Sequence, residues 1–320
     1  MKNNVRYDLF LEKLYSKYPK KSRLTQALMD LLHLEREAIY RRLRKEMFFS
    51  SQEIMKIASS WNISLDDIIG VDALKIAFLM QPVNFCGPSQ AENYFLRNII
   101  TLYETTHQFP NAEFMSICNK IPKAIYANFA NLNHYFLFKW LYLFGNENDV
   151  VCFSKATIPE ESKPLISDYT RAIKNVPNTS FIWDENIFYY LINNIKYFHS
   201  IQLITDNEKK LLKEDLHALL SYLQNVADKG CYPETGKKVN LYISQINIDT
   251  NYSYIFSPEV NVCFVHSFEQ SVIYSSNTDF VENFKKWMQY KRRTSIQISE
   301  VDAKTRIEFF SKQLQRVDHL

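Results

Sequence analysis

Three short helical periods, separated by tight breaks, occupy residues 22–70. In Arg23–Leu32, apolar residues recur at steps of three and four, so this helix can bury only one side. The third period opens with Ser50 and Glu53, spaced as a capping box in which each side chain accepts a hydrogen bond from the other residue's backbone N–H. A further short turn is expected from Ser64, and Gly70 is expected to end the unit. The pattern predicts a small helical domain.

The middle period, expected as one helix over Glu35–Met47, has a narrow apolar seam and a broad polar face. At about 100° per residue, Ile39 and Leu43 fall together, and the far side carries the polar residues. Those residues are Glu37, Tyr40, Arg41, Arg44 and Lys45. One interpretation is a solvated helix whose terminal charges complement the helix dipole. The other is a helix that enters a DNA major groove, where guanidinium groups donate to guanine edges or phosphates.

Charge is unevenly distributed along the chain. Residues 1–50 hold twelve Lys and Arg against six Asp and Glu, a balance of +6 in a protein whose net charge is +3. Near Pro19, basic residues cluster where the first predicted helix meets the second: Lys17, Lys20, Lys21 and Arg23. Such a cluster can neutralise phosphates and make binding salt-dependent. A basic membrane-binding arm is the competing interpretation, but the apolar face of residues 5–18 is better used in closing a helical core.

These residues also carry a resemblance to a known family. Residues 24–32, 36–43, 54–58 and 63–66 resemble the helix-turn-helix domain of the Cro/C1-type (XRE-like) transcriptional regulators, over about a fifth of the chain. The resemblance implies five helices, with Tyr7–Tyr18 as the first. Two places depart from the family pattern: His33 stands where members often have a glycine, and Lys45-Glu46-Met47 replaces a Gly-Lys-type exit.

The family also implies roles for individual residues. Its second central helix reads the major groove, and the start of the preceding helix contacts phosphate. By position, the candidate base-reading residues are Arg36, Glu37, Tyr40, Arg41 and Arg44. The candidate contacts to the DNA backbone are Lys20, Lys21, Ser22, Arg23, Thr25 and Lys45. The usual geometry of the family further implies a homodimer on a pseudo-palindromic site.

The remaining chain is long enough, at 320 residues and 46% hydrophobic content, for two or three domains with substantial cores. No apolar run reaches the length of a membrane span, and Met1–Phe10 does not have the pattern of a signal peptide. Five cysteines without a C-x-x-C pair favour reduced thiols, which indicates a cytoplasmic protein with no structural zinc site. We expect no membrane partner.

Periodicity predicts a chain that is mainly α with a C-terminal α+β part. The expected domains are 1–70, a connecting helix and linker over 71–88, a helical regulatory or oligomerisation region over 89–230, and an antiparallel sheet plus two helices over 231–320. Helices are expected in the middle region at 91–106, 111–119, 125–130, 135–144, 164–173, 186–199 and 206–228. An antiparallel meander is expected from strands at 239–248, 252–256, 260–266 and 271–274, with helices at 278–290 and 301–317 covering one face.

Catalytic signals are scarce. The seven histidines lack metal-type spacing, no nucleotide-binding or nucleophile-elbow motif occurs, and only five glycines are present. We therefore expect no enzyme, no cofactor and no metal site. Aromatic runs at Tyr135–Phe144 and Phe188–Phe198 are typical of a helical core, but they are also compatible with a pocket for a small-molecule or peptide effector. The basic triplet at 291–293 is either a solvated helix end or a second nucleic-acid contact.

Together these patterns predict a transcriptional regulator that binds double-stranded DNA in a sequence-specific manner. The alternative is a protein–protein interaction module whose helix-turn-helix-shaped head has no specific DNA target. An enzyme with a DNA-tethering head is a third, weaker hypothesis.

Overall fold

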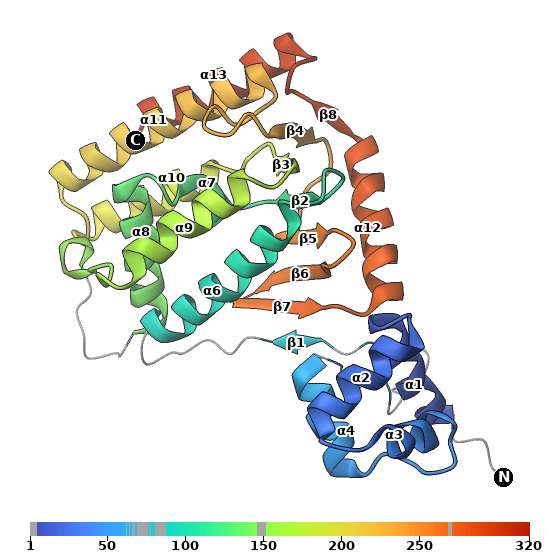
Figure 1. The fold of residues 1–320 in the computed structure, drawn as a ribbon. Coiled ribbons are helices and arrows are strands. Elements are labelled where there is room, and N and C mark those ends of the chain that lie inside the picture. The colour runs from blue at the N-terminus through green and yellow to red at the C-terminus, as the bar shows by residue number, and fades with distance from the viewer. Residues whose placement is uncertain are drawn as a thin grey trace. The chain divides into compact units, whose positions relative to one another are not determined.

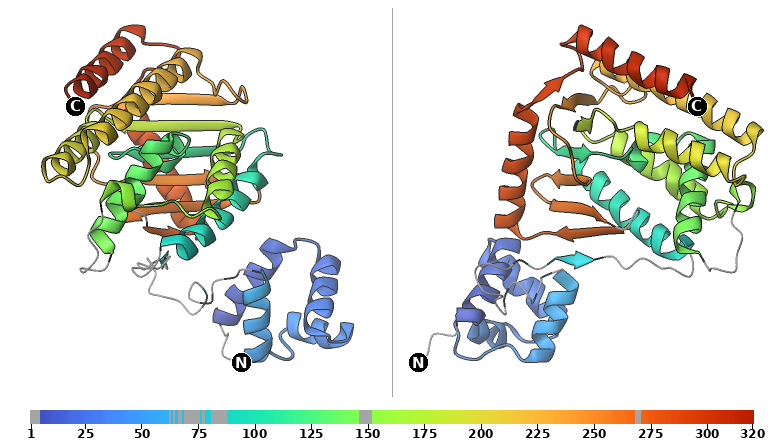
Figure 2. Two further views of the ribbon diagram at one scale, coloured as in Figure 1. Left: turned by 90° about the vertical axis from the view of Figure 1, so that its left-hand side faces the viewer. Right: turned by 180° about the vertical axis from the view of Figure 1, so that it is seen from behind.

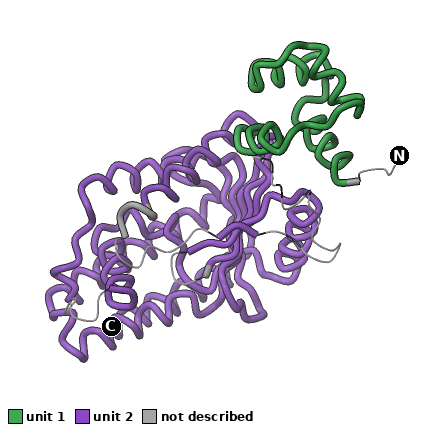
Figure 3. The backbone as a smooth tube through the Cα atoms, turned by 90° about the horizontal axis from the view of Figure 1, so that it is seen from below, with its two compact units in different colours: residues 1–77 green, residues 78–320 purple. Residues whose placement is uncertain are grey.

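The chain divides into two compact units, residues 1–77 and 78–320 (Figure 3). The computed structural model describes residues 5–61, 63, 65, 68, 76, 78–80, 88–145, 152–267 and 271–320. The short turn predicted from Ser64, the closing Gly70 and most of the predicted 71–88 connector therefore lie outside the described residues.

Unit 1 is helical, and its helices follow the apolar periods of the sequence (Figure 1). They are α1 (Val5–Lys17), α2 (Lys21–Leu32), α3 (Arg36–Leu43) and α4 (Ser51–Trp61). Each contributes one stripe to a common core, which includes Phe10, Leu14, Leu24, Leu28, Ile39 and Ile57. The predicted capping box starts α4: the Ser50 hydroxyl accepts from the Glu53 N–H at 3.2 Å, and the Glu53 carboxylate accepts from the Ser50 N–H at 2.8 Å.

Unit 2 is built on one mixed sheet of eight strands in the order β1-β7-β6-β5-β2-β3-β4-β8, counted among the described residues. The strands are β1 (Leu79–Met80), β2 (Glu113–Cys118), β3 (Asn178–Asp184), β4 (Lys238–Ser244), β5 (Tyr252–Phe256), β6 (Asn261–Ser267), β7 (Ser271–Ser275) and β8 (Ser295–Gln297). Strands β2, β3 and β4 run parallel, whereas every other pairing is antiparallel. Parallel neighbours need long crossovers, and helices supply them here.

The helices cover both faces of this sheet (Figures 1 and 2). One face carries α6 (Pro88–Thr106), α7 (Lys123–Tyr126), α8 (Ala130–Phe144), the short η1 (Phe153–Lys155), α9 (Ser162–Lys174), α10 (Tyr189–Ser200), α11 (Asp206–Lys229) and α13 (Ala303–Asp318). The opposite face is covered by α12 (Thr278–Arg293). Unit 2 is thus a three-layer α/β/α arrangement.

The central strands bury side chains on both faces. In β3, Phe181 and Trp183 enter the larger core under α6–α11, whereas Ile182 enters the smaller core under α12. In β2, Phe114 enters the larger core and Met115 enters the smaller one. Because successive side chains of a strand point to opposite faces, a strand covered on both sides shows no alternation of polar and apolar residues.

That loss of alternation explains where the predicted fold class is wrong. The chain is mixed α/β, and its sheet is not confined to the C-terminal part, because β2 and β3 lie in the region predicted to be helical. The segment 111–119, predicted as a helix, contains β2. Leu79 and Met80, placed at the end of a predicted connecting helix, form β1 and pair with β7.

The C-terminal prediction is confirmed in part. Strands β5, β6 and β7 form the expected antiparallel meander, and β5 has the predicted bounds. Strand β4 does not belong to the meander, because it pairs in parallel with β3. The two final helices do not share a face: α12 packs over Ile182, whereas Phe309 of α13 lies against Trp183 on the other side, with ring centroids 6.1 Å apart.

The smaller core predicts a clear contrast between two residues of α12. Met288→Ala should lower the free energy of unfolding of unit 2 by about 2–5 kcal/mol, because Met288 is fully buried between α12 and the sheet. The exposed Asn283 is the matched control, and Asn283→Ala should change it by less than about 0.5 kcal/mol. Denaturant unfolding of the full chain, followed by tryptophan fluorescence, measures both. Equal stabilities would mean that α12 does not pack as described.

Candidate nucleic-acid interface

A three-residue turn, His33-Leu34-Glu35, joins α2 to α3. His33 adopts a left-handed conformation, with φ 56° and ψ 41°, and its N–H donates to the Met29 carbonyl at 2.8 Å. Glycine is the usual residue in this conformation, although histidine is one of the side chains enriched there. His33 therefore adopts a backbone conformation in which glycine is the usual residue.

Helix α3 ends in the same manner. It is shorter than the predicted Glu35–Met47, because Lys45 has φ 65° and turns the chain out of the helix. The Arg41 carbonyl accepts from the N–H groups of Glu46, at 2.9 Å, and of Met47, at 3.3 Å. Such a left-handed residue after a helix is a common C-terminal cap, and it fixes how far α3 extends.

The polar face of α3 brings the predicted base-reading residues together. Ile39 and Leu43 are buried against the core of unit 1. On the rest of the helix, four candidates are exposed and one is half-buried: Arg36, Glu37, Arg41 and Arg44, with Tyr40. The arrangement leaves a largely polar, mostly cationic surface on one short helix.

Ion pairs on this face are solvent-exposed. Arg44 pairs with Glu37 at 2.6 Å and with Glu46 at 3.0 Å, and Arg41 lies 3.9 Å from Glu46. Exposed pairs of this kind contribute about 0–1 kcal/mol each, so these guanidinium groups can exchange a carboxylate for another anion at little cost. Arg36 has no ion pair within the described residues.

The start of α2 presents a second cationic group of side chains. Four of the residues predicted to contact the DNA backbone are exposed there: Lys20, Lys21, Ser22 and Arg23. The N-cap residue, Lys20, offers no side-chain hydrogen bond, and the first turn contains no acidic residue. The free N–H groups and the positive end of the helix dipole therefore face solvent together with these cations, which favours an anion. Lys21 also lies over the Tyr40 ring, 5.6 Å from its centroid, and so links α2 to α3.

Two other residues predicted to contact the DNA backbone, Thr25 and Lys45, differ from these four. Thr25 is only 2% exposed, and its hydroxyl donates to the Lys21 carbonyl at 2.8 Å, so it does not reach the surface as expected. Thr25 lies on the same side of α2 as Leu24 and Leu28, and its side chain is therefore buried with theirs. Lys45 is exposed, but its ammonium group pairs with Asp8 of α1 at 2.6 Å.

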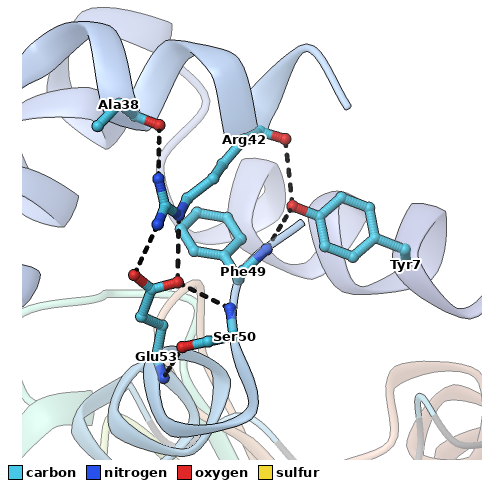
Figure 4. A network of polar contacts seen from close by, with 6 residues as sticks. All are labelled: Tyr7, Ala38, Arg42, Phe49, Ser50 and Glu53. Carbon is cyan, nitrogen blue, oxygen red and sulfur yellow. Dashed lines mark hydrogen bonds and ion pairs between the residues drawn. The ribbon is translucent and has the colours of Figure 1, made fainter. Parts of the chain in front are cut away.

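Sequence reasoning gave no site role to Arg42, which joins α3 to α4 (Figure 4). Its guanidinium forms a bidentate pair with Glu53, at 2.8 and 3.1 Å, and donates to the Ala38 carbonyl at 3.0 Å. The two side chains are only 12% and 18% exposed. The capping box identified Glu53 in the sequence, but nothing in the sequence pointed to Arg42 as the cation that pairs with it.

Tyr7 of α1 completes the same network (Figure 4). Its hydroxyl donates to the Arg42 carbonyl at 3.1 Å and accepts from the Phe49 N–H at 3.2 Å. Burial raises the pKa of Tyr7 to about 12. Burial also pulls the pKa of Glu53 upward, but the hydrogen bonds from Arg42 and Ser50 outweigh it and hold that pKa below 4.5. The network therefore fixes α3 against both α1 and α4.

In unit 2, the two aromatic runs supply mainly core. Phe138 and Phe198 are buried with ring centroids 4.9 Å apart, and Tyr135 lies 6.3 Å from each of them. Outward-facing rings of the same runs are Tyr142, Tyr189, Tyr190 and Tyr197. An effector pocket lined by these rings stays a prediction.

The carboxyl ends of β2 and β3 are where α/β sheets commonly bind ligands. Here the β4–β5 loop crosses that edge. The Asn119 amide donates to the carbonyls of Ile248 and Asp249, at 3.0 and 2.9 Å, and the Asp184 carboxylate accepts from the Ile248 N–H at 3.3 Å. The side chains of Asn119 and Asp184 are thus hydrogen-bonded to backbone groups of the β4–β5 loop.

The left-handed turn at His33 predicts opposite effects of two substitutions. His33→Gly should leave unit 1 at least as stable as the parent, whereas His33→Val should be less stable than His33→Gly by about 1–2 kcal/mol, because a β-branched side chain is strained at this φ. Hydrogen exchange of the unit 1 amides in the full chain measures the difference. Equal protection in the two variants would contradict the turn geometry.

The Arg42–Glu53 pair predicts both a stability loss and a pH dependence. Arg42→Ala should lower the free energy of unfolding of unit 1 by about 1–3 kcal/mol, because it leaves a largely buried carboxylate without its cation. Arg41→Ala, on the exposed face of the same helix, should cost less than about 0.5 kcal/mol.

A lowered pKa means that Glu53 stabilises unit 1 above pH 4.5 and loses this effect as pH falls through the folded-state pKa. Glu53→Gln should therefore be less stable than the parent at pH 7 and less sensitive to acid below pH 4.5. Hydrogen exchange at pH 7, together with acid titration of unit 1 unfolding, tests both statements. A parent and a variant with parallel acid curves would contradict them.

Three further observations bear on function. No helix in the described part of the chain is both long and apolar enough to cross a membrane. Among the same residues, no three His, Cys, Asp or Glu side chains are grouped so that they could hold a metal ion. Comparison of the chain with protein-family models, with curated proteins and with solved structures gives no match.

Proposed function

We propose that this protein is a transcriptional regulator whose unit 1 binds double-stranded DNA through α3. One observation carries the proposal: α3 buries Ile39 and Leu43 and holds Arg42 in a mostly buried ion pair, while its outer surface displays Arg36 and Arg41, with Arg44 directly after its end, beside Glu37 and Tyr40. A helix inserted in the major groove needs such a surface, because arginine donates in pairs to guanine and the tyrosine hydroxyl reaches bases or phosphates.

The start of α2 supports the same docking. Its exposed Lys20, Lys21 and Arg23, together with the uncapped N–H groups of the first turn, form a site suited to a phosphate. In the helix-turn-helix geometry, the helix before the reading helix crosses the DNA backbone. Contacts of this kind set affinity and its salt dependence, whereas the α3 side chains set sequence preference.

Two left-handed residues, one at the end of α2 and one directly after α3, support the resemblance to Cro/C1-type regulators. His33 and Lys45 stand at the two positions where the family pattern has glycine, and both have positive φ. A substitution of residue type at these positions is thus accommodated without a change of turn. By the same analogy, two copies of the chain bind the half-sites of an inverted repeat, and unit 2 serves as the regulatory and oligomerisation region.

The competing hypothesis is that the same face binds another protein. The exposed arginines of this face could bind acidic side chains of a partner protein as well as a phosphate. Specificity separates the two, because a regulator selects one DNA sequence from many, whereas an interaction module does not.

Selection of genomic fragments by the purified full chain tests the proposal. We expect enrichment of one inverted-repeat sequence, with an affinity that falls steeply as salt rises. Uniformly weak binding to all fragments would favour the interaction module.

On the selected fragment, Arg41→Ala and Arg44→Ala should each weaken binding by about 1–3 kcal/mol for a lost guanine pair while unit 1 stays folded. Lys56→Ala is the matched control, because Lys56 is exposed on α4 and its loss changes the charge equally. Gel-shift or anisotropy titration gives the three affinities. Parent-like binding by both arginine variants would exclude α3 as the reading helix.

A further inference from the structure

Helix α12 has two faces of different chemistry. Its inner face packs Val281, Phe284 and Met288 against the sheet residues Met115 and Ile182. Lys285 also turns inward, where it pairs with Glu113 and lies over the Phe256 ring, 3.5 Å from the centroid. Helix α12 therefore packs on the sheet through this inner face.

The outer face combines cations with exposed aromatic rings. Trp287 is 37% exposed and Tyr290 is 62% exposed. Lys291 lies 6.0 Å from the Trp287 centroid, and Arg293 lies 5.4 Å from the Tyr290 centroid. Lys286 is exposed on the same side, and within the described part of the chain none of these three cations has an ion pair.

Helix-end electrostatics explains only part of this surface. Cations in the last turn complement the helix dipole, and Lys291 and Arg293 fit that role. Lys286 lies two turns before the end of α12, where the dipole gains nothing from it. The acidic residues of the helix are Asp279 and Glu282. Glu282 lies one turn before Lys286, but no ion pair joins these two described residues, and the last two turns of α12 contain no acidic residue.

The chain enters unit 2 beside the first turn of α12. Phe78 is the first residue of unit 2, and its ring lies 5.1 Å from that of Phe280, while Leu79 and Met80 pair with the edge strand β7. Arg293 is thirteen residues beyond Phe280, which at 1.5 Å per residue is about 20 Å along the helix. The chain therefore joins unit 2 at the first turn of α12.

We propose that the outer face of α12 is a second DNA contact, which binds phosphates that flank the sequence read by unit 1. The proposal rests on the function proposed above for unit 1. Lys286 and Arg293 are seven residues apart on one side of the helix, so they are separated by about 10 Å along its axis, or about three base-pair steps. The Tyr290 hydroxyl and the Trp287 N–H add hydrogen-bond donors between them, of the kind that contact DNA backbones.

The test uses the full chain and two duplexes: the shortest fragment that retains selective binding, and the same fragment with about two turns of DNA added on each side. The test variant is Lys286→Ala/Arg293→Ala. Its matched control is Lys210→Ala/Lys229→Ala, which removes two exposed cations from α11. Arg41→Ala reports on unit 1 independently.

We expect the α12 variant to bind the long duplex about tenfold more weakly than the parent, with the slope of log affinity against log salt reduced by about 2, one for each lost phosphate contact. On the short duplex it should match the parent. The α11 control should match the parent on both, and Arg41→Ala should lose affinity on both.

Other outcomes separate the two proposals. If the α12 variant matches the parent on the long duplex while Arg41→Ala loses affinity, the second contact is refuted and the function of unit 1 stands. If neither variant changes binding to either duplex, both proposals fail. If the α12 variant keeps its DNA affinity but loses binding to anionic phospholipid vesicles, the surface is a lipid contact and the proposal is overturned.

Discussion

Two-sided burial of the parallel strands is the constraint on which the architecture of unit 2 depends. Strands β2 and β3 present large apolar side chains in both directions, so neither face of the sheet can remain in water. The crossover helices cover one face as a consequence of the connectivity. In the described part of the chain, α12 covers the other face, and because it packs with one side only, its outer side is exposed.

In unit 1, the four arginines of the α3 region divide into two roles. Arg42 is held by Glu53 and by the Ala38 carbonyl, so its charge serves the packing of α3 on α4. The other three remain exposed, with at most weak surface pairs. The buried arginine thus fixes the orientation of α3, and the exposed ones lie on its solvent side.

Sequence patterns predicted the elements that are solvated on one side, because there the period of burial is visible in the order of residues. The helices of unit 1 belong to this group. The β5–β7 meander does not, since β5 and β6 are buried on both faces; it was predicted from β-branched and aromatic runs joined by turn residues. Strands β2 and β3 were missed because burial on both faces removes the alternation, and periodicity alone does not distinguish a short apolar run among helices from a buried helix segment. Within the candidate interface, the exposed residues of α3 follow from the helical wheel. The burial of Thr25 and the pairing of Arg42 do not, since each depends on how neighbouring helices pack.

The two-residue strand β1 has a consequence for the solubility of unit 2. An uncovered edge strand presents a row of free N–H and C=O groups that can pair with another molecule and begin aggregation. Leu79 and Met80 pair with part of the edge of β7, opposite Tyr274 and Ile273. A fragment that starts after Met80 would leave the edge of β7 unpaired at these positions, so the first residues of unit 2 protect the sheet edge.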